Sequence, residues 1–343
     1  MESKKKVDVD VSPEIYEYLD QRERKSMEEA YKKGVIGRGI KQLNENLVDE
    51  LLAGSIHVHE HGGSEPIPRI YDEFDMAINA CKSGVRALVI KTHYTPSSSR
   101  VGLTQRFVDE WAKRNERESV QIYGGVVLNY PVGGLNPAAV RASAGFPNGK
   151  FVWMPTLDTY HHVETTGGAT TGYLRDEEES GIRLLDKDGK VVPELKQILE
   201  IIAENDMILA IGHYPAADRT AVIDEALKTG VKCILADHPI EYHSKGTIED
   251  LKVLAAKGVY VGMFALTCLI IPPVEGDDYP AKMFHGLPAD NIVIGSDCGM
   301  TMALPHIDGI RWMIRYMLYH DIPIKDIEKM LKKNPARLLG IPE

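Results

Sequence analysis

From residue 55 onward, short apolar runs alternate with longer amphipathic segments. Eight apolar runs end in small or polar residues, and they cover residues 56–61, 87–94, 121–129, 151–158, 207–214, 232–239, 259–266 and 292–299. The segments between them carry apolar residues at helical spacing, such as Ile70, Phe74, Ile78 and Cys81. Eight strands that alternate with helices predict an α/β fold with parallel pairing, a closed TIM-like (β/α)8 barrel.

An open, doubly wound sheet is the rival architecture for this alternation. That fold usually carries a glycine-rich nucleotide-binding turn directly after its first strand. Here the first run ends in histidines, and Gly62 and Gly63 follow only afterwards. The pattern therefore favours the barrel.

The segments outside the regular alternation define the remaining organisation. Residues 1–50 are polar and helix-prone, with Pro13 at a plausible helix start, and they predict a helical lead-in to a barrel over 51–343.

After Asp158 about 35 residues pass before Leu195, and they include Thr/Gly-rich sequence and a turn at Asp188-Gly189 that predicts a small hairpin. A long loop at the end of a barrel strand is often a lid over the active site, and a disordered surface insertion is the alternative; for residues 159–194 we favour the lid.

Composition and charge exclude several classes of function. The chain has 343 residues, of which 43% are hydrophobic, and its net charge is −10. Such a charge provides no basic surface for nucleic acid or for an anionic membrane. No apolar stretch approaches the roughly 18 residues of a membrane span, and no signal peptide is visible. The four cysteines are widely separated, so we expect a reduced, cytoplasmic protein.

The first run, Ser55-Ile56-His57-Val58-His59-Glu60-His61, carries the strongest chemical signal. Strict alternation on a strand would put His57 and His59 on one face, about 7 Å apart. Two neutral imidazoles at that spacing can share a divalent cation. A His-x-His pair alone is a weak signal, because most such pairs bind no metal.

Later strands strengthen the signal, because the active site of a parallel barrel lies at the carboxyl ends of its strands. The ends of the later runs carry potential ligands or proton-transfer groups, namely Lys91, His93, Asn129, Thr156, Asp158, His213, Asp237, His238 and Asp297. Such clustering at one end of the barrel is not expected of residues that only fill the core.

In their order along the strands, His57-x-His59, His213, His238 and Asp297 resemble the amidohydrolase superfamily of metal-dependent hydrolases. The end of the chain, from Asn334 to Gly340, is similar to the closing helix of that superfamily. Segments 127–129, 153–158 and 182–186 resemble a branch without an assigned reaction. The resemblance spans residues 55–340.

The resemblance implies a metal held by His57, His59, His213 and Asp297. It further implies Asp297 as the proton acceptor and His238 as the group that polarises the substrate or binds a second metal. Histidine and carboxylate ligands suit Zn²⁺ best, with Mn²⁺ or Fe²⁺ as alternatives. One ion is favoured over two, because binuclear members usually carry a bridging lysine on the fourth strand and this chain has none there.

Lys91 is the one lysine at a predicted strand end, on the second strand. Three interpretations stay open for it: a carbamylated bridge between metals, a cation that holds a substrate carboxylate, and an exposed lysine. We favour the second interpretation, because a compact ammonium is a good anchor for an anion.

A further set of residues is assigned to substrate binding, each with an alternative that is only structural. The set consists of His93, Asn129, Trp153, Thr156, Asp158, His162 and Arg100. Asn129, Trp153 and Thr156 line the pocket or fill the barrel core. Asp158 is a ligand or a turn cap, and Arg100 clamps an anion or is solvated.

These observations predict a metal-dependent hydrolase of a small amide, cyclic amide, lactone or related ester, with an anionic substrate compatible. Non-oxidative decarboxylation by the same kind of site is the first alternative. A non-catalytic binding protein on a degenerate barrel is the second. The expected partner is a small molecule, with neither nucleic acid nor membrane, and a homo-oligomer is compatible with the sequence.

Overall fold

The computed structural model describes residues 43–165, 181–241, 244, 246–269 and 279–343. Its compact unit spans Asn44–Glu343. The predicted helix near Pro13 lies outside the described residues, and so does the Thr/Gly-rich part of the predicted lid. The domain boundary at residue 50 and the lid function both stay predictions.

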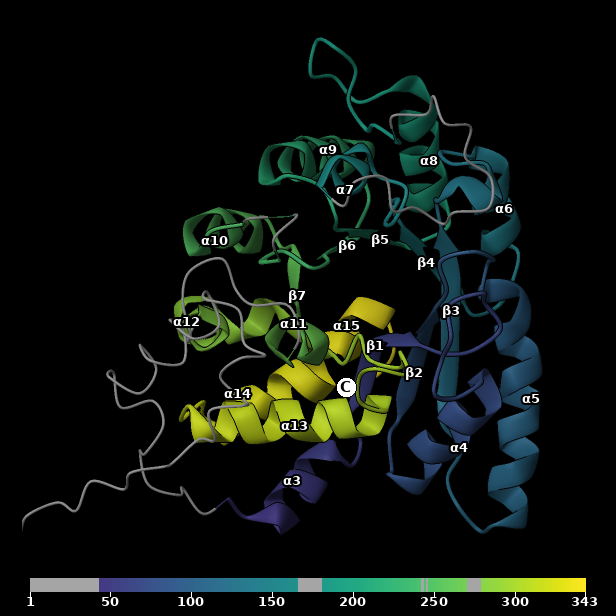
Figure 1. Cartoon of the computed structure of the whole chain (residues 1–343), viewed down its shortest axis with the longest axis vertical. Helices are drawn as coiled ribbons and strands as arrows, with labels where there is room; N and C mark the ends of the chain where they lie inside the picture. Colours follow the sequence, from purple (N-terminus) through teal and green to yellow (C-terminus); the bar gives the residue numbers. More distant parts are fainter. Residues whose placement is uncertain (1–42, 166–180, 242–243, 245, 270–278) are drawn as a thin grey trace, which may run out of the picture. The chain divides into compact units, whose positions relative to one another are not determined.

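Eight parallel strands form one sheet whose order follows the sequence. They are β1 (Ile56–His61), β2 (Ala87–Lys91), β3 (Gln121–Val127), β4 (Gly149–Trp153), β5 (Ile208–Ile211), β6 (Cys233–Ala236), β7 (Tyr260–Phe264) and β8 (Ile292–Gly295). β8 returns beside β1, where Asp297 N donates to His59 O at 3.0 Å. This arrangement, visible in Figure 1, confirms the predicted (β/α)8 barrel.

Helices follow the strands and cover the outside of the barrel (Figure 1). The α-helices are α3 (Glu45–Leu52), α4 (Glu73–Lys82), α5 (Ser98–Arg114), α6 (Pro137–Ala144), α7 (Tyr160–Thr165), α8 (Pro193–Glu204), α9 (Ala216–Thr229), α10 (Ile248–Ala256), α11 (Ala265–Leu269), α12 (Tyr279–Gly286), α13 (His306–Tyr319), α14 (Ile324–Glu328) and α15 (Asn334–Leu339). Two 3₁₀ turns, η1 (Tyr130–Val132) and η2 (Ala289–Asn291), and a π-helical turn, η3 (Lys329–Lys333), complete them. No helix among the described residues is long and apolar enough to cross a membrane.

Two apolar layers hold the barrel together. The inner layer comes mostly from alternate strand residues, among them Val58, Val89, Phe151 and Phe264. The outer layer joins the opposite strand faces to the helices, as Leu88 does. The strands therefore read as continuous buried runs, as expected of parallel strands covered on both sides.

The observed strands end earlier than the predicted runs, except for β1. For example, the run at 207–214 contains a strand only over Ile208–Ile211. The polar residues at the run ends therefore lie in the loops at the carboxyl edge, where a barrel carries its active site. In the predicted lid, Leu185 and Val191 pair through one antiparallel bridge, a minimal form of the predicted hairpin.

Candidate metal centre

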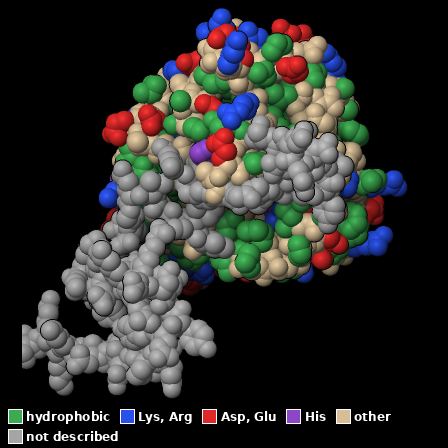
Figure 2. Space-filling view, turned by 45° about the horizontal axis from the view of Figure 1, so that its top comes forward, with side chains coloured by type: hydrophobic (Ala, Val, Ile, Leu, Met, Phe, Trp, Pro, Cys, Tyr) green, Lys and Arg blue, Asp and Glu red, His purple; other side chains and the backbone are tan. Residues whose placement is uncertain are grey.

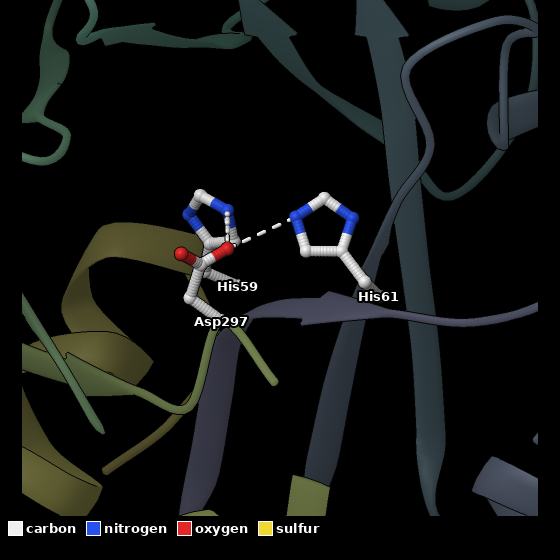
Figure 3. Close-up of side chains that lie close together, drawn as sticks. All are labelled: His59, His61 and Asp297. Atoms are coloured by element: carbon white, nitrogen blue, oxygen red, sulfur yellow. Dashed lines mark ion pairs between the residues drawn. The ribbon is translucent and has the colours of Figure 1, made fainter. Parts of the chain in front are cut away.

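His59, His61 and Asp297 converge at the carboxyl end of the barrel (Figure 3). Asp297 Oδ1 lies 3.1 Å from His59 Nε2 and 3.0 Å from His61 Nε2. Both imidazoles belong to β1, whereas Asp297 follows β8. All three side chains are buried, so the polar atoms that face one another are shielded from bulk water.

A β-bulge in β1 decides which histidines reach this site. His57 pairs with Leu88 of β2, but Glu60 pairs with Ile90, so β1 has one extra residue between these positions. A bulge shifts the phase of the side chains that follow it. His57 and Glu60 consequently share the outward face with Leu88 and Ile90, whereas His59 and His61 reach the barrel mouth.

The expectation that His57 and His59 share one face is therefore wrong. His57 packs under α13, where its Nε2 lies 2.9 Å from Ser55 Oγ and its ring centroid lies 6.4 Å from that of His306. Because of the bulge, His61 lies at the position near Asp297 where the sequence predicted His57. The sequence named His61 in the same stretch but did not assign it as a ligand.

Each of the two site histidines is oriented by a further side chain. His59 Nδ1 lies 3.2 Å from Asp237 Oδ1, and His61 Nδ1 lies 3.2 Å from Arg69 Nη2. Burial alone would raise the pKa of Asp237, but His59 and Lys91 lower it to about 2. A carboxylate on the far nitrogen of a ligating histidine is a common support in metal sites, because it fixes the ring and its tautomer.

Three of the predicted functional residues share an unusual backbone conformation. His213, His238 and Asp297 follow β5, β6 and β8, and their φ angles are 60°, 46° and 52°. Residues other than glycine rarely adopt a left-handed conformation, and such strain clusters at functional sites. The backbone at these strand ends therefore adopts a strained conformation, and all three side chains line the same cavity.

His238 faces the opposite side of Asp297. Its ring centroid lies 4.9 Å from that of His59 and 4.8 Å from that of His213, and its Nδ1 lies 2.6 Å from Glu241 Oε1. Burial alone would lower the pKa of His238, but the carboxylates of Glu241, Asp297 and Asp237 raise it to about 9. Burial would likewise raise the pKa of Asp297, but His238 and His59 hold it well below its usual value.

Lys91 lies inside the site, on β2. It is fully buried, so the interpretation of an exposed lysine is wrong. Its Nζ lies 3.1 Å from His59 Nε2 and 3.9 Å from Asp237 Oδ2. The interpretations as a substrate anchor and as a carbamylated bridge both stay open for this position.

A cavity of about 200 Å³ opens onto this cluster. It is lined by His61, Ile67, Arg69, Lys91, His93, Leu157, His162, His213, His238, Glu241, Leu266, Asp297 and Met300. Among the described side chains on the face that Figure 2 shows, histidine is visible only at one small spot, beside acidic side chains. The small volume of the cavity, and the burial of Lys91, His238 and Asp297 in its lining, suit a small molecule.

Three residues predicted to bind substrate form one hydrogen-bonded group at the rim. Thr156 Oγ1 lies 2.9 Å from His93 Nδ1 and 2.9 Å from Asn129 Nδ2. The ring of His93 stacks on that of His61, with centroids 4.8 Å apart. Only His93 of the three lines the cavity, so Asn129 and Thr156 support it from behind.

The other predicted substrate-binding residues divide between the cavity and the scaffold. His162 lines the cavity. Trp153 stacks on Phe151 inside the barrel, and Asp158 Oδ2 accepts a hydrogen bond from Tyr130 N, as a turn cap would. Arg100 binds Glu73 at 2.7 Å and does not line the cavity. Arg100 thus stays away from the cavity. Trp153 and Asp158 do not line it either, but the ring centroid of Trp153 lies 6.0 Å from Lys91 Nζ.

Sequence reasoning missed two roles that the geometry reveals. Asp237 was predicted only as one of several polar groups at strand ends and received no role, although it supports His59. Glu241 was not named, although it lies three residues after His238 and contacts its ring. An acidic residue so close to a candidate histidine in the sequence is the signal that could have identified Glu241.

The donor set fits a divalent cation of the Zn²⁺, Mn²⁺ or Fe²⁺ type. Two imidazole nitrogens and a carboxylate oxygen lie within 4.8 Å of one another, and all are buried. Separations of 3.0 and 3.1 Å between donor atoms are close to those expected around an ion with bonds of about 2.0–2.2 Å. The orientation of His59 by Asp237 agrees with the same chemistry.

Comparison with solved structures gives many neighbours at low sequence identity. An amidohydrolase from Pseudomonas aeruginosa aligns over 86% of this chain and 97% of its own, with 12% identity and a TM-score of 0.53. A putative 2-pyrone-4,6-dicarboxylic acid hydrolase from Pseudomonas putida aligns over 84% and 97%, with 15% identity and a TM-score of 0.54. A variant of a PTE-like lactonase from Deinococcus radiodurans aligns over 85% and 97%, with 13% identity and a TM-score of 0.53.

At these identities the neighbours show that this chain shares their barrel fold, which is the fold that the resemblance implied. No curated protein sequence matches the chain. One family model matches residues 54–262, which contain β1 and most of the later site residues but not Asp297. On that match the chain belongs to the family described as "Family of unknown function (DUF6282)".

Proposed function

We propose that this protein is a metal-dependent hydrolase that uses activated water to cleave an amide, cyclic amide, lactone or related ester of a small substrate. The convergence of His59, His61 and Asp297 beside a small buried cavity carries this proposal. The fold supports it, because the structural neighbours include proteins described as an amidohydrolase and a lactonase.

The ligand set that we propose differs from the set implied by the sequence. His59, His61 and Asp297 would hold the cation. His213 lines the same cavity and is proposed as a further ligand. His57 is not part of the set, because it lies on the outward face of β1.

A divalent cation bound there would lower the pKa of its water to near 7 and so supply hydroxide at neutral pH. Asp297 would accept the proton of the attacking water and pass it to the leaving group. The neighbouring histidines hold the pKa of Asp297 well below its usual value, which keeps the carboxylate ionised. His238, on the far side of Asp297, would polarise the substrate oxygen.

Lys91 and Arg69 make an anionic substrate compatible with the cavity. Both line it, but Arg69 is already paired with Glu65. Lys91 would therefore be the group that holds a substrate carboxylate. A decarboxylase could use Lys91 in the same way. Hydrolysis and decarboxylation therefore have to be distinguished by the product that forms.

The test combines metal analysis of the purified protein with a substrate screen. We expect about one equivalent of a divalent metal, and turnover of lactones or cyclic amides that stops after chelation and returns with metal. Release of CO₂ from aromatic carboxylates, without hydrolysis, would replace the hydrolase by the decarboxylase. Protein that binds no metal under any loading condition would overturn both and favour a binding protein.

A further inference from the structure

The barrel closes differently between β8 and β1 than between its other strands. Neighbouring strands from β1 through β8 pair in parallel ladders, and no ladder joins β8 to β1 in the described part of the chain. Two backbone hydrogen bonds cross this seam instead. Asp297 N donates to His59 O at 3.0 Å, and His61 N donates to Cys298 O at 3.3 Å.

Glu60 makes a third link across the seam, from the residue between the two site histidines. Its Oε1 accepts a hydrogen bond from Ser296 N at 2.8 Å, and its Oε2 accepts one from Ser296 Oγ. Ser296 Oγ in turn accepts a hydrogen bond from Cys298 N at 3.0 Å. One side chain thus accepts hydrogen bonds from both donors, N–H and Oγ–H, of the residue that precedes Asp297.

This link is dry. Glu60, Ser296 and Cys298 have no exposed surface. Helix α13 lies directly over them, since a Cβ at Gly309 would come 2.8 Å from Cys298 Sγ and 3.0 Å from Ser296 Cβ. Losing one of these hydrogen bonds would leave a buried polar group unpaired, which costs free energy.

The position of the link ties it to the geometry of the metal centre. Asp297 has a φ of 52°, a conformation that costs free energy and persists only where neighbouring contacts impose it. The contacts of Ser296 fix the backbone immediately before this strained residue. Glu60 stands between His59 and His61, so the same carboxylate fixes the strand that carries the two imidazoles.

We propose that Glu60 and Ser296 are positioning residues, which set the placement of His59 and His61 relative to Asp297 across the barrel seam. This inference rests on the metal centre of the proposed function. Neither residue touches the cavity, so both act only through the ligands they hold in place.

The experiment uses full-length variants Glu60→Ala, Ser296→Ala, their double variant and the conservative Glu60→Gln. Asn334→Ala is the matched control, because Asn334 is also fully buried and binds the carbonyls of Ala289 and Ile292 at the opposite end of β8. For each variant we would measure the affinity for Zn²⁺ by chelator competition and the visible absorption spectrum of the Co²⁺-loaded protein. The unfolding midpoint of the metal-free protein would be measured alongside.

Glu60→Ala should weaken Zn²⁺ binding by about 10–100-fold, the usual cost of losing a residue that supports a ligand, and should change the Co²⁺ spectrum. The double variant should be no weaker than Glu60→Ala, and Glu60→Gln should recover most of the affinity. Asn334→Ala should lower the unfolding midpoint but stay within about twofold of wild-type affinity. If Glu60→Ala does not fold, Ser296→Ala carries the same test.

Wild-type Zn²⁺ affinity and an unchanged Co²⁺ spectrum in Glu60→Ala, or in Ser296→Ala where that variant carries the test, would overturn the positioning role and leave the metal centre intact. A parallel loss of affinity in Asn334→Ala would also overturn it, since the effect would then follow stability alone. Wild-type protein that binds neither Zn²⁺ nor Co²⁺ would overturn the metal centre itself and this inference with it.

Discussion

His57 and His59 lie two positions apart on β1, yet their side chains point to opposite sides of the barrel wall. His57 contacts Ser55 and the ring of His306 on α13, whereas His59 contacts Asp237 and Asp297 inside the barrel mouth. The extra residue between His57 and Glu60 produces this reversal, because a bulge moves every later side chain to the other face. One face of β1 thus packs against α13, and the other face carries the histidines of the candidate site.

The reversal makes His61 a candidate ligand and places His57 in the core. His61→Ala should weaken Zn²⁺ binding by more than the roughly 10–100-fold that loss of a supporting residue costs. His57→Ala should keep wild-type metal content and lose about 0.5–3 kcal/mol of folding free energy. Metal analysis and denaturant unfolding of both variants measure these effects. If His57→Ala loses the metal and His61→Ala retains it, strict side-chain alternation in β1 would be correct and the bulge would be wrong.

Asp297→Asn should abolish turnover without unfolding the barrel. The amide is isosteric, and asparagine tolerates the left-handed conformation that residue 297 adopts. It cannot accept the proton of water, and general-base removal alone costs about 100-fold or more in rate. Turnover assays on a substrate found by screening, with circular dichroism to check folding, measure both effects. A folded variant with wild-type turnover would exclude Asp297 as the proton acceptor.

Removal of the metal should lower thermal stability as well as activity. A ligand present at 100 times its dissociation constant stabilises the folded state by about 2.7 kcal/mol. For a chain of this size that corresponds to a fall of about 4 °C in the unfolding midpoint. Thermal unfolding of chelated and Zn²⁺-loaded protein measures the difference. His61→Ala serves as the control, because its unfolding midpoint should not change when Zn²⁺ is added. If Zn²⁺ also leaves the wild-type midpoint unchanged, the proposed metal site is wrong.

The barrel could be predicted from the sequence because its strands are buried on both faces. Runs such as Ile208–Ile211 are continuously apolar, and glycines such as Gly230, with a φ of 94°, end the helices before the next strand. The predicted runs extended into loops because their polar ends still carry alternating apolar residues. Met154, for example, is buried although β4 ends at Trp153.

The site could be predicted only in part. The sequence identified His59, His213, His238 and Asp297, because their positions at strand ends follow from the fold. The bulge that replaces His57 by His61 leaves no local mark, since β1 contains no glycine or proline at the irregularity. The support of His59 by Asp237 depends on pairing across the barrel, which residues far apart in sequence do not reveal.

Burial of His306 should make folding sensitive to mild acid. Burial lowers the pKa of its imidazole to about 4, below the 6.5 of an unfolded histidine. The unfolded state therefore binds the proton first as pH falls, so stability present above pH 6.5 is lost progressively down to about pH 4. Between pH 7 and pH 5 this residue should account for a loss of about 2 kcal/mol. His306→Leu should reduce the acid loss by that amount, as denaturant unfolding at the two pH values would measure. An equal acid loss in wild type and variant would mean that His306 protonates as readily in the folded protein as in the unfolded chain.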